Sequence, residues 1–355
     1  ALLERLTRLI GMQQPQINHS LSGWEGWFAF CSGYKQEGLE KLNKQLEFAQ
    51  HQGDFAHVAY TALLMANEYD SIGDLEDALK SIEQSLAILE QIPGSDHPLI
   101  LGIRGNAWSI YGVILILLDR IDQARQVILQ AEDALRRSGA RYGLIRLLDA
   151  QARLANKDDK PEESYNLRLQ ALAIAEEYND RRRIADLLNN LAHSAEKLGE
   201  WSLAYAHSSR CAQICNELGD RHLSAINNNN LGYLTLQLKK PASEAILYYR
   251  KSLAIFREIQ LNLGVFYTLR DIARAYLQVG DLDQAHHSLL EALHIGHDFA
   301  KPLLVLHLLP YIARLLAKTG LVGAAMQFCS IVLQHPQAEA GFQRAAAELL
   351  ADLFG

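Results

Sequence analysis

Side chains that readily support catalysis or metal binding are few and scattered in this sequence. His207, Cys211 and Cys215 are spaced four residues apart, which would place them on one face of a helix and could suit a metal. The same positions are the small and apolar ones of that helix, so we expect them to pack and bind no metal. The sequence has no phosphate-cradling glycine loop, no His-Glu-x-x-His and no Gly-x-Ser-x-Gly. We expect a protein that is not an enzyme and holds no cofactor.

A regular repeat accounts for most of the chain. Eight turn positions recur at intervals of 40, 46, 40, 40, 40, 41 and 40 residues: Gly33, Gly73, Asp119, Asp159, Gly199, Lys239, Gly280 and Gly320. Seven residues before each lies a glycine or alanine: Gly26, Ala66, Gly112, Ala152, Ala192, Gly232, Ala273 and Ala313. Five residues after each turn, counted from Lys240 in the sixth unit, lies another small residue. Such a period predicts a stack of similar units whose helices approach closely at the small residues.

Each unit is predicted to be a helix, a turn and a second helix. Apolar residues follow helical spacing on both sides of each turn, and no run alternates as a strand would, so the fold class is all-α. We expect eight helix pairs over residues 22–335 and a capping helix in 336–355. Residues 1–21 are expected to be a short helix and linker from a preceding region.

The turn of the seventh unit resembles a tetratricopeptide repeat. Residues 272–285 read IARAYLQVGDLDQA, with the small residue, the tyrosine, the turn glycine and the following alanine of that family. Its usual period is about 34 residues, so a period of forty implies longer helices. This length, and the Asn-Asn-Leu-small steps at 189–192 and 229–232, are similar to the long repeats of kinesin light chains and bacterial regulators. The resemblance implies a right-handed α-α superhelix.

In such a superhelix the first helix of each unit lines the concave side. The positions 13, 10 and 6 residues before each turn then point inward. The ligand-binding candidates at these positions are Arg146, Asp149, Arg153, Asn189, His193, Asn229, Tyr233, Tyr267, Arg270, Arg274 and Arg314.

These inward residues are basic, polar and aromatic. Arginine binds carboxylate or phosphate with two parallel hydrogen bonds, and tyrosine adds a flat surface with a polar tip. We expect the partner to be a protein or peptide, or a small anionic effector, bound in the concave groove. The alternative is that the charges pair among themselves, for example Arg153 with Glu196.

A second resemblance concerns the context of the array. The His335-Pro336 step before an alanine-rich last helix, and the phrase NELGDR at 216–221, resemble the carboxyl ends of bacterial STAND signalling ATPases of the maltose-regulon activator type. This implies a sensor region that contacts an upstream nucleotide-binding module. Two alternatives stay open: a stand-alone adaptor that binds peptide segments of partners, and a peptide receptor of the quorum-sensing kind.

Composition limits the class of partner and compartment. The formal net charge of −7 argues against nucleic-acid binding by the chain as a whole. Four scattered cysteines form no disulfide framework, so we expect a reducing, cytoplasmic location. The longest apolar run, residues 111–118, is too short to span a membrane. It is apolar nearly all round, which predicts either coverage by neighbouring elements or an apolar ligand patch.

Overall fold

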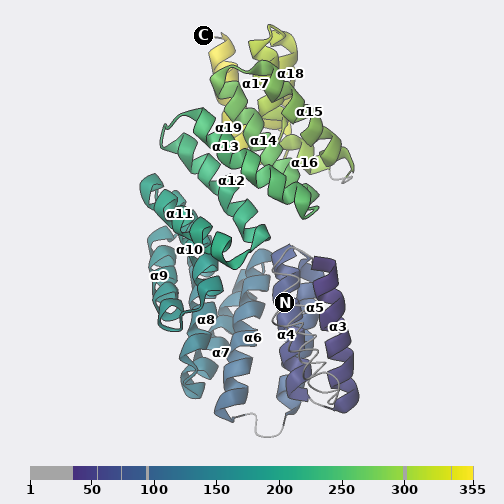
Figure 1. Ribbon diagram of the computed structural model, residues 1–355, viewed down its shortest axis with the longest axis vertical. Coiled ribbons are helices and arrows are strands. Elements are labelled where there is room, and N and C mark those ends of the chain that lie inside the picture. The colour runs from purple at the N-terminus through teal and green to yellow at the C-terminus, as the bar shows by residue number, and fades with distance from the viewer. Residues whose placement is uncertain are drawn as a thin grey trace. The chain divides into compact units, whose positions relative to one another are not determined.

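The computed structural model describes residues 35–53, 55–72, 74–92, 96–298, 302–336 and 338–354. The expected helix and linker at 1–21, the first helix of the first unit, and the turn positions Gly33 and Gly73 lie outside these residues. The described residues are almost entirely helical and fall into two compact units, divided between Asp220 and Arg221. Figure 1 shows the helices in chain order.

The first unit consists of α3 followed by four helix pairs. Each pair is antiparallel and is joined by a short turn (Figure 1). The bounds are α3 Lys35–Gln52, α4 Phe55–Ile72, α5 Leu75–Gln91, α6 Pro98–Leu117, α7 Ile121–Ser138, a 3-10 turn at Arg141–Gly143, α8 Leu144–Lys157, α9 Pro161–Glu177, α10 Arg181–Lys197 and α11 Trp201–Leu218.

The second unit consists of three further pairs and a last helix. Its bounds are α12 Arg221–Gln237, α13 Ala242–Glu258, α14 Asn262–Val279, α15 Leu282–Asp298, α16 Pro302–Leu306, α17 Leu309–Lys318, α18 Val322–Gln334 and α19 Ala340–Phe354. The expected first helix of the eighth repeat is thus divided into α16 and α17. Pro310 explains the break, because proline has no N–H to donate within a helix but suits the first turn of a new one.

The turn positions predicted from the repeat share one backbone conformation. Every described one is left-handed, with φ of 59° at Asp119, 57° at Asp159, 75° at Gly199, 54° at Lys239, 82° at Gly280 and 84° at Gly320. A residue in this conformation ends a helix and reverses the chain. The period therefore reflects a stereochemical requirement at each turn.

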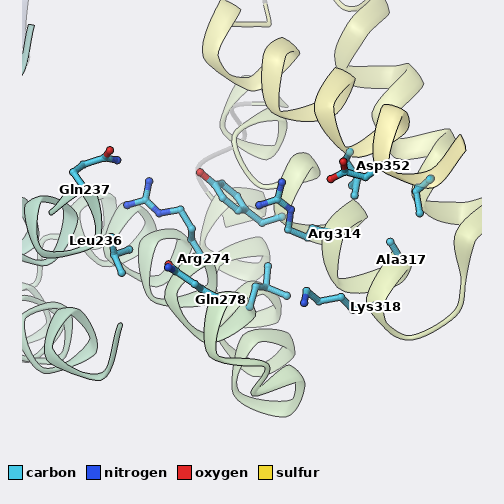
Figure 2. A pocket seen from close by; sticks show the side chains of 12 residues that line it. Leu236, Gln237, Arg274, Gln278, Arg314, Ala317, Lys318 and Asp352 are labelled. Carbon is cyan, nitrogen blue, oxygen red and sulfur yellow. The ribbon is translucent and has the colours of Figure 1, made fainter. Parts of the chain in front are cut away.

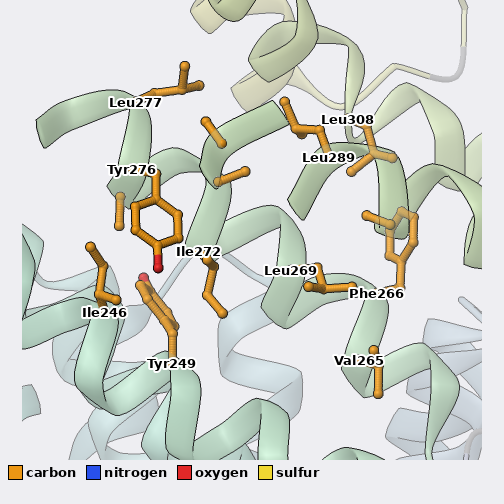
Figure 3. Close-up of a cluster of buried hydrophobic side chains, with 14 of the residues drawn as sticks. Ile246, Tyr249, Val265, Phe266, Leu269, Ile272, Tyr276, Leu277, Leu289 and Leu308 are labelled. Carbon is orange, nitrogen blue, oxygen red and sulfur yellow. The ribbon is translucent and has the colours of Figure 1, made fainter. Parts of the chain in front are cut away.

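The small residues of the repeat lie where paired helices touch. The described ones are buried, among them Ala152, Ala192 and Ala273, each fully inaccessible. A Cβ placed on Gly232 in α12 would lie 2.7 Å from the ring of Tyr249 in α13, which is itself fully buried. The same ring belongs to the core of the second unit, shown in Figure 3. The prediction of close approach at these positions is confirmed.

The apolar run of the third repeat is covered by its neighbours. It forms the second half of α6, and Ile114, Leu115 and Ile116 are at most 3 % exposed. They belong to two core clusters shared with α4, α5, α7 and α8. By length and hydropathy α6 would pass for a membrane span, yet 67 % of its apolar window is buried within the unit. Packing against neighbouring helices therefore accounts for most of this apolar run, although Leu117 at its end is 44 % exposed.

Lys239 provides a test of the turn geometry. It is exposed and left-handed, whereas glycine adopts this conformation without a steric penalty. Lys239→Gly is expected to raise the free energy of unfolding by about 1 kcal/mol in urea titrations. Gly280→Ala, at the equivalent turn, is expected to lower it by a similar amount. A loss of stability in Lys239→Gly would contradict this account of the repeat.

Candidate functional site

In the first unit, the predicted groove residue Asp149 is the centre of a polar network. Its carboxylate accepts hydrogen bonds from Arg153 on the same helix, at 3.0 Å, and from Arg168 on α9, at 3.1 Å. The amide of Asn190 on α10 donates to it at 3.2 Å. Arg168 also donates to the hydroxyl of Ser194. The network joins three helices of two successive repeats, so these groups are held in place by one another.

Arg168 was not among the residues predicted from the sequence. It stands nine residues after the turn residue Asp159, where the other repeats place core residues such as Ile128 and Leu289. Its side chain is only 5 % exposed. A buried arginine needs a charged partner. An arginine at a position that is buried in the other repeats, as at Ile128, Ser208 and Leu289, was therefore the signal for this network.

The remaining predicted residues of the first unit are less connected to it. His193 is 60 % exposed at its side chain, with its Nδ1 3.7 Å from the carboxylate of Glu196. Arg146 and Asn189 are half-buried, and each interacts with a neighbouring group. One ion pair of Arg153 is with Asp149, within one helix. The alternative, in which the charged residues pair with one another and not with a ligand, thus applies to Asp149, Arg153 and Arg168 of this unit.

In the second unit, Arg274 on α14 is held between two tyrosines. Its guanidinium lies 5.1 Å from the ring centre of Tyr233 on α12 and donates to the hydroxyl of Tyr249 at 3.0 Å. Burial alone would lower the pKa of Arg274, but Tyr249 and Asp271 outweigh this and raise it. The side chain therefore stays protonated and fixed in direction.

A second cluster of polar side chains in this unit surrounds Asp271. Arg270 donates to one carboxylate oxygen at 3.0 Å, and Asn229 donates to the other at 3.0 Å. The guanidinium of Arg270 also lies 5.1 Å from the ring centre of Tyr267. Five of the predicted residues of this unit are thus brought together in two groups: Asn229, Arg270 and Tyr267 around Asp271, and Tyr233 with Arg274.

The aromatic contacts continue onto the last helix. Tyr267 stacks near His307, with ring centres 5.8 Å apart, and His307 lies 4.8 Å from Phe342 on α19. Burial lowers the pKa of His307, which favours the neutral ring. The helix predicted only as a cap therefore also supplies a wall of the groove.

A pocket of about 680 Å³ opens beside Arg274 (Figure 2). Helices α12, α14, α17 and α19 contribute its walls. The polar lining consists of Gln237, Arg274, Gln278, Tyr311, Arg314, Lys318 and Asp352. The apolar lining consists of Leu236, Leu277, Ala317, Leu349 and Leu353. A volume of this size suits a small molecule or a short stretch of peptide.

The cations of the pocket differ from most arginines of the chain in having no anionic partner. On other surfaces, Arg141 pairs with Glu177 at 2.7 Å and Arg257 pairs with Glu291 at 2.5 Å. Arg314, however, forms no ion pair with any residue that the structure describes. Lys318 likewise forms no ion pair within the described ranges. The pocket is therefore lined by three cations that form no ion pair with a described residue, and by one carboxylate, that of Asp352.

The residues considered for metal binding have other contacts. The hydroxyl of Tyr165 lies 3.0 Å from Nε2 of His207, and the thiol of Cys211 donates to the carbonyl of Ala185. In the part of the chain that the structure describes, no group of three His, Cys, Asp or Glu side chains could hold a metal ion.

Comparison with known proteins identifies the kind of repeat. Residues 183–258 match the sequence model of the tetratricopeptide repeat. This is a tetratricopeptide-repeat fold. No curated protein matches the sequence. Repeat folds of this kind form extended concave surfaces that are used for binding, in general to other proteins.

Solved structures show the same fold at low sequence identity. A STAND protein with a tetratricopeptide-repeat sensor, PH0952 from Pyrococcus horikoshii, matches 92 % of this chain with a TM-score of 0.63 and 14 % identity. This chain spans only 49 % of that protein. A Rap protein in complex with Competence and Sporulation Factor matches 96 % of this chain and 99 % of its own, with a TM-score of 0.56 and 15 % identity.

A third structure is BtubC from P. vanneervenii, with a TM-score of 0.54 and 18 % identity over 64 % of this chain and 92 % of that one. The tetratricopeptide-repeat fold thus occurs in a multidomain ATPase, in the Rap protein of about this chain's length, and in the shorter BtubC.

The Asp149 network predicts a dependence of stability on pH. Burial would raise the pKa of Asp149, but the guanidinium groups of Arg153 and Arg168 outweigh it and lower the pKa to about 2. The folded-state pKa is thus below the unfolded value of about 3.9. The carboxylate stabilises the fold above pH 4, and this contribution is lost as the pH falls from about 4 toward 2.

Asp149→Asn is therefore expected to lower the free energy of unfolding by about 3 kcal/mol at pH 7, because it leaves Arg168 buried without its anion. The difference from wild type should shrink as the pH falls from about 4 toward 2, measured by urea titration. Asp133→Asn, which removes an exposed ion pair on α7, serves as the control and should change stability little. A pH-independent loss in Asp149→Asn would contradict the assigned role.

Proposed function

We propose that the chain is a recognition domain that binds an anionic segment of a protein, or a small anionic effector, in the groove of its second unit. The main support for this proposal is that Arg314 and Lys318 line the pocket and form no ion pair with a described residue. Arg274 adds a third cation, and its Nε is buried without a hydrogen-bond partner among the described residues. An unsatisfied buried donor costs free energy, and a hydrogen bond from this Nε to a bound anion would remove that cost.

The proposed context is the sensor region of a cytoplasmic STAND-type signalling ATPase. It is supported by the likeness to the STAND protein PH0952, of which this chain would correspond to about half. In this context the repeats contact an upstream nucleotide-binding module. A ligand that contacts several repeats would favour one arrangement of the array and so shift the equilibrium of that module between two states.

The second candidate is a stand-alone adaptor. The likeness to the Rap protein, whose structure was solved in complex with Competence and Sporulation Factor and which is covered over 99 % of its length, favours it. Both candidates use the groove for recognition. The coding sequence upstream of Ala1 separates them: a phosphate-binding loop motif supports the ATPase context, and a start codon a few residues before Ala1 supports the adaptor.

The binding proposal is tested by removing the positive charges of Arg314 and Lys318. We expect the double substitution Arg314→Gln and Lys318→Gln to weaken binding of a labelled pool of Asp- and Glu-rich octapeptides at least about tenfold, measured by fluorescence anisotropy. Wild-type binding should also weaken as salt is raised. The control, Arg344→Gln with Lys251→Gln, removes the same charge at exposed positions outside the pocket. Equal affinities of both double variants would refute the proposal.

A further inference from the structure

The pocket of the second unit is lined by one carboxylate, that of Asp352, in addition to its cations. Asp352, near the end of α19, is exposed and lines the same pocket as Arg274, Arg314 and Lys318 (Figure 2). It forms no ion pair with any described residue, so it lies more than 4.0 Å from the nitrogens of all three cations. Charges of both signs thus line one pocket without forming an ion pair with each other.

The backbone at the end of α19 adds to the negative charge of Asp352. Asp352 stands in the last turn of the helix, which ends at Phe354. The carbonyl groups of a last turn have no partners within the helix and give that end a partial negative charge. A cation near Asp352 is therefore favoured by the carboxylate and by the helix end together. An anion is favoured beside Arg274 and Arg314.

Apolar side chains occupy the rest of the lining. Leu277 comes from α14, and Leu349 and Leu353 come from α19. They provide a surface for hydrocarbon alongside the charged groups, and apolar contact is favourable in roughly the proportion of area buried. A ligand matched to this lining has an acidic group, a basic group and an apolar part.

We propose that the pocket recognises a peptide segment that carries both an acidic and a basic residue with an apolar residue between them. This rests on the proposed function and refines it, since the groove would select a bipolar segment and not simply an acidic one. Arg274 and Arg314 take the carboxylate, and Asp352 takes the basic group. Asp352 thereby sets specificity, because a purely acidic segment would meet its like charge.

The probe is a displayed library of random twelve-residue peptides, selected in parallel on wild type, on Asp352→Asn and on the double variant Arg314→Gln, Lys318→Gln. We expect peptides enriched on wild type to carry an acidic and a basic residue at a recurring spacing. Selection on Asp352→Asn should retain the acidic residue and lose the basic one. Glu348→Gln, an exposed carboxylate of α19 outside the pocket, is the matched control and should leave the wild-type pattern unchanged.

The outcomes separate the two proposals. Acidic residues alone in the wild-type peptides, or an unchanged basic preference on Asp352→Asn, would overturn the role of Asp352 while leaving anion recognition intact. Enrichment that is identical on wild type and on the double variant would overturn anion recognition itself. For a peptide that is selected as expected, Asp352→Asn should weaken binding about tenfold. Replacing the basic residue of the peptide by glutamine should cause no further loss in that variant.

Discussion

The close approach of paired helices at the small residues is the constraint on which the rest of this structure depends. Ala192 and Ala273 have no accessible surface, and Gly232 lies against the ring of Tyr249 with no room for a Cβ. Interiors packed this densely tolerate few voids and few overlaps. One face of each first helix is thereby committed to packing, and the residues on its other face are free to differ from repeat to repeat.

The two units use that freedom differently. In the first unit the polar residues satisfy one another, since Asp149 accepts from Arg153, Arg168 and Asn190. A network of this kind fixes neighbouring repeats and has little capacity left for a ligand. In the second unit the cations of Arg314 and Lys318 remain without anionic partners among the described residues. The physical difference between the two groups of charges is the reason for placing recognition in the second unit.

The sequence was sufficient for those features that every repeat must share. The turn positions were predicted from their spacing, and Asp119 and Lys239 adopt the same left-handed conformation as the glycines because each must reverse the chain there. The division of the eighth first helix was not predicted, although Pro310 was visible, because helical spacing continues on both sides of it.

The features of a single repeat were harder to predict. Arg168 projects from a second helix, so a search confined to first helices missed it. Asp352 was missed for another reason: α19 was expected to be a cap, and only its placement beside α17 shows that it lines the pocket. Which charges remain unpaired depends on distances between helices, and a repeat pattern does not contain those distances.

Site-specific photo-cross-linking in the cells of origin tests the central claim most directly. A photoreactive residue at Gln278, inside the pocket, is compared with one at His287, an exposed position on α15. If recognition occurs in the pocket, a partner is cross-linked from position 278 and not from position 287, and the double substitution of Arg314 and Lys318 by glutamine abolishes the product. A partner cross-linked from position 287 alone, or one captured at position 278 regardless of those two charges, would contradict the account.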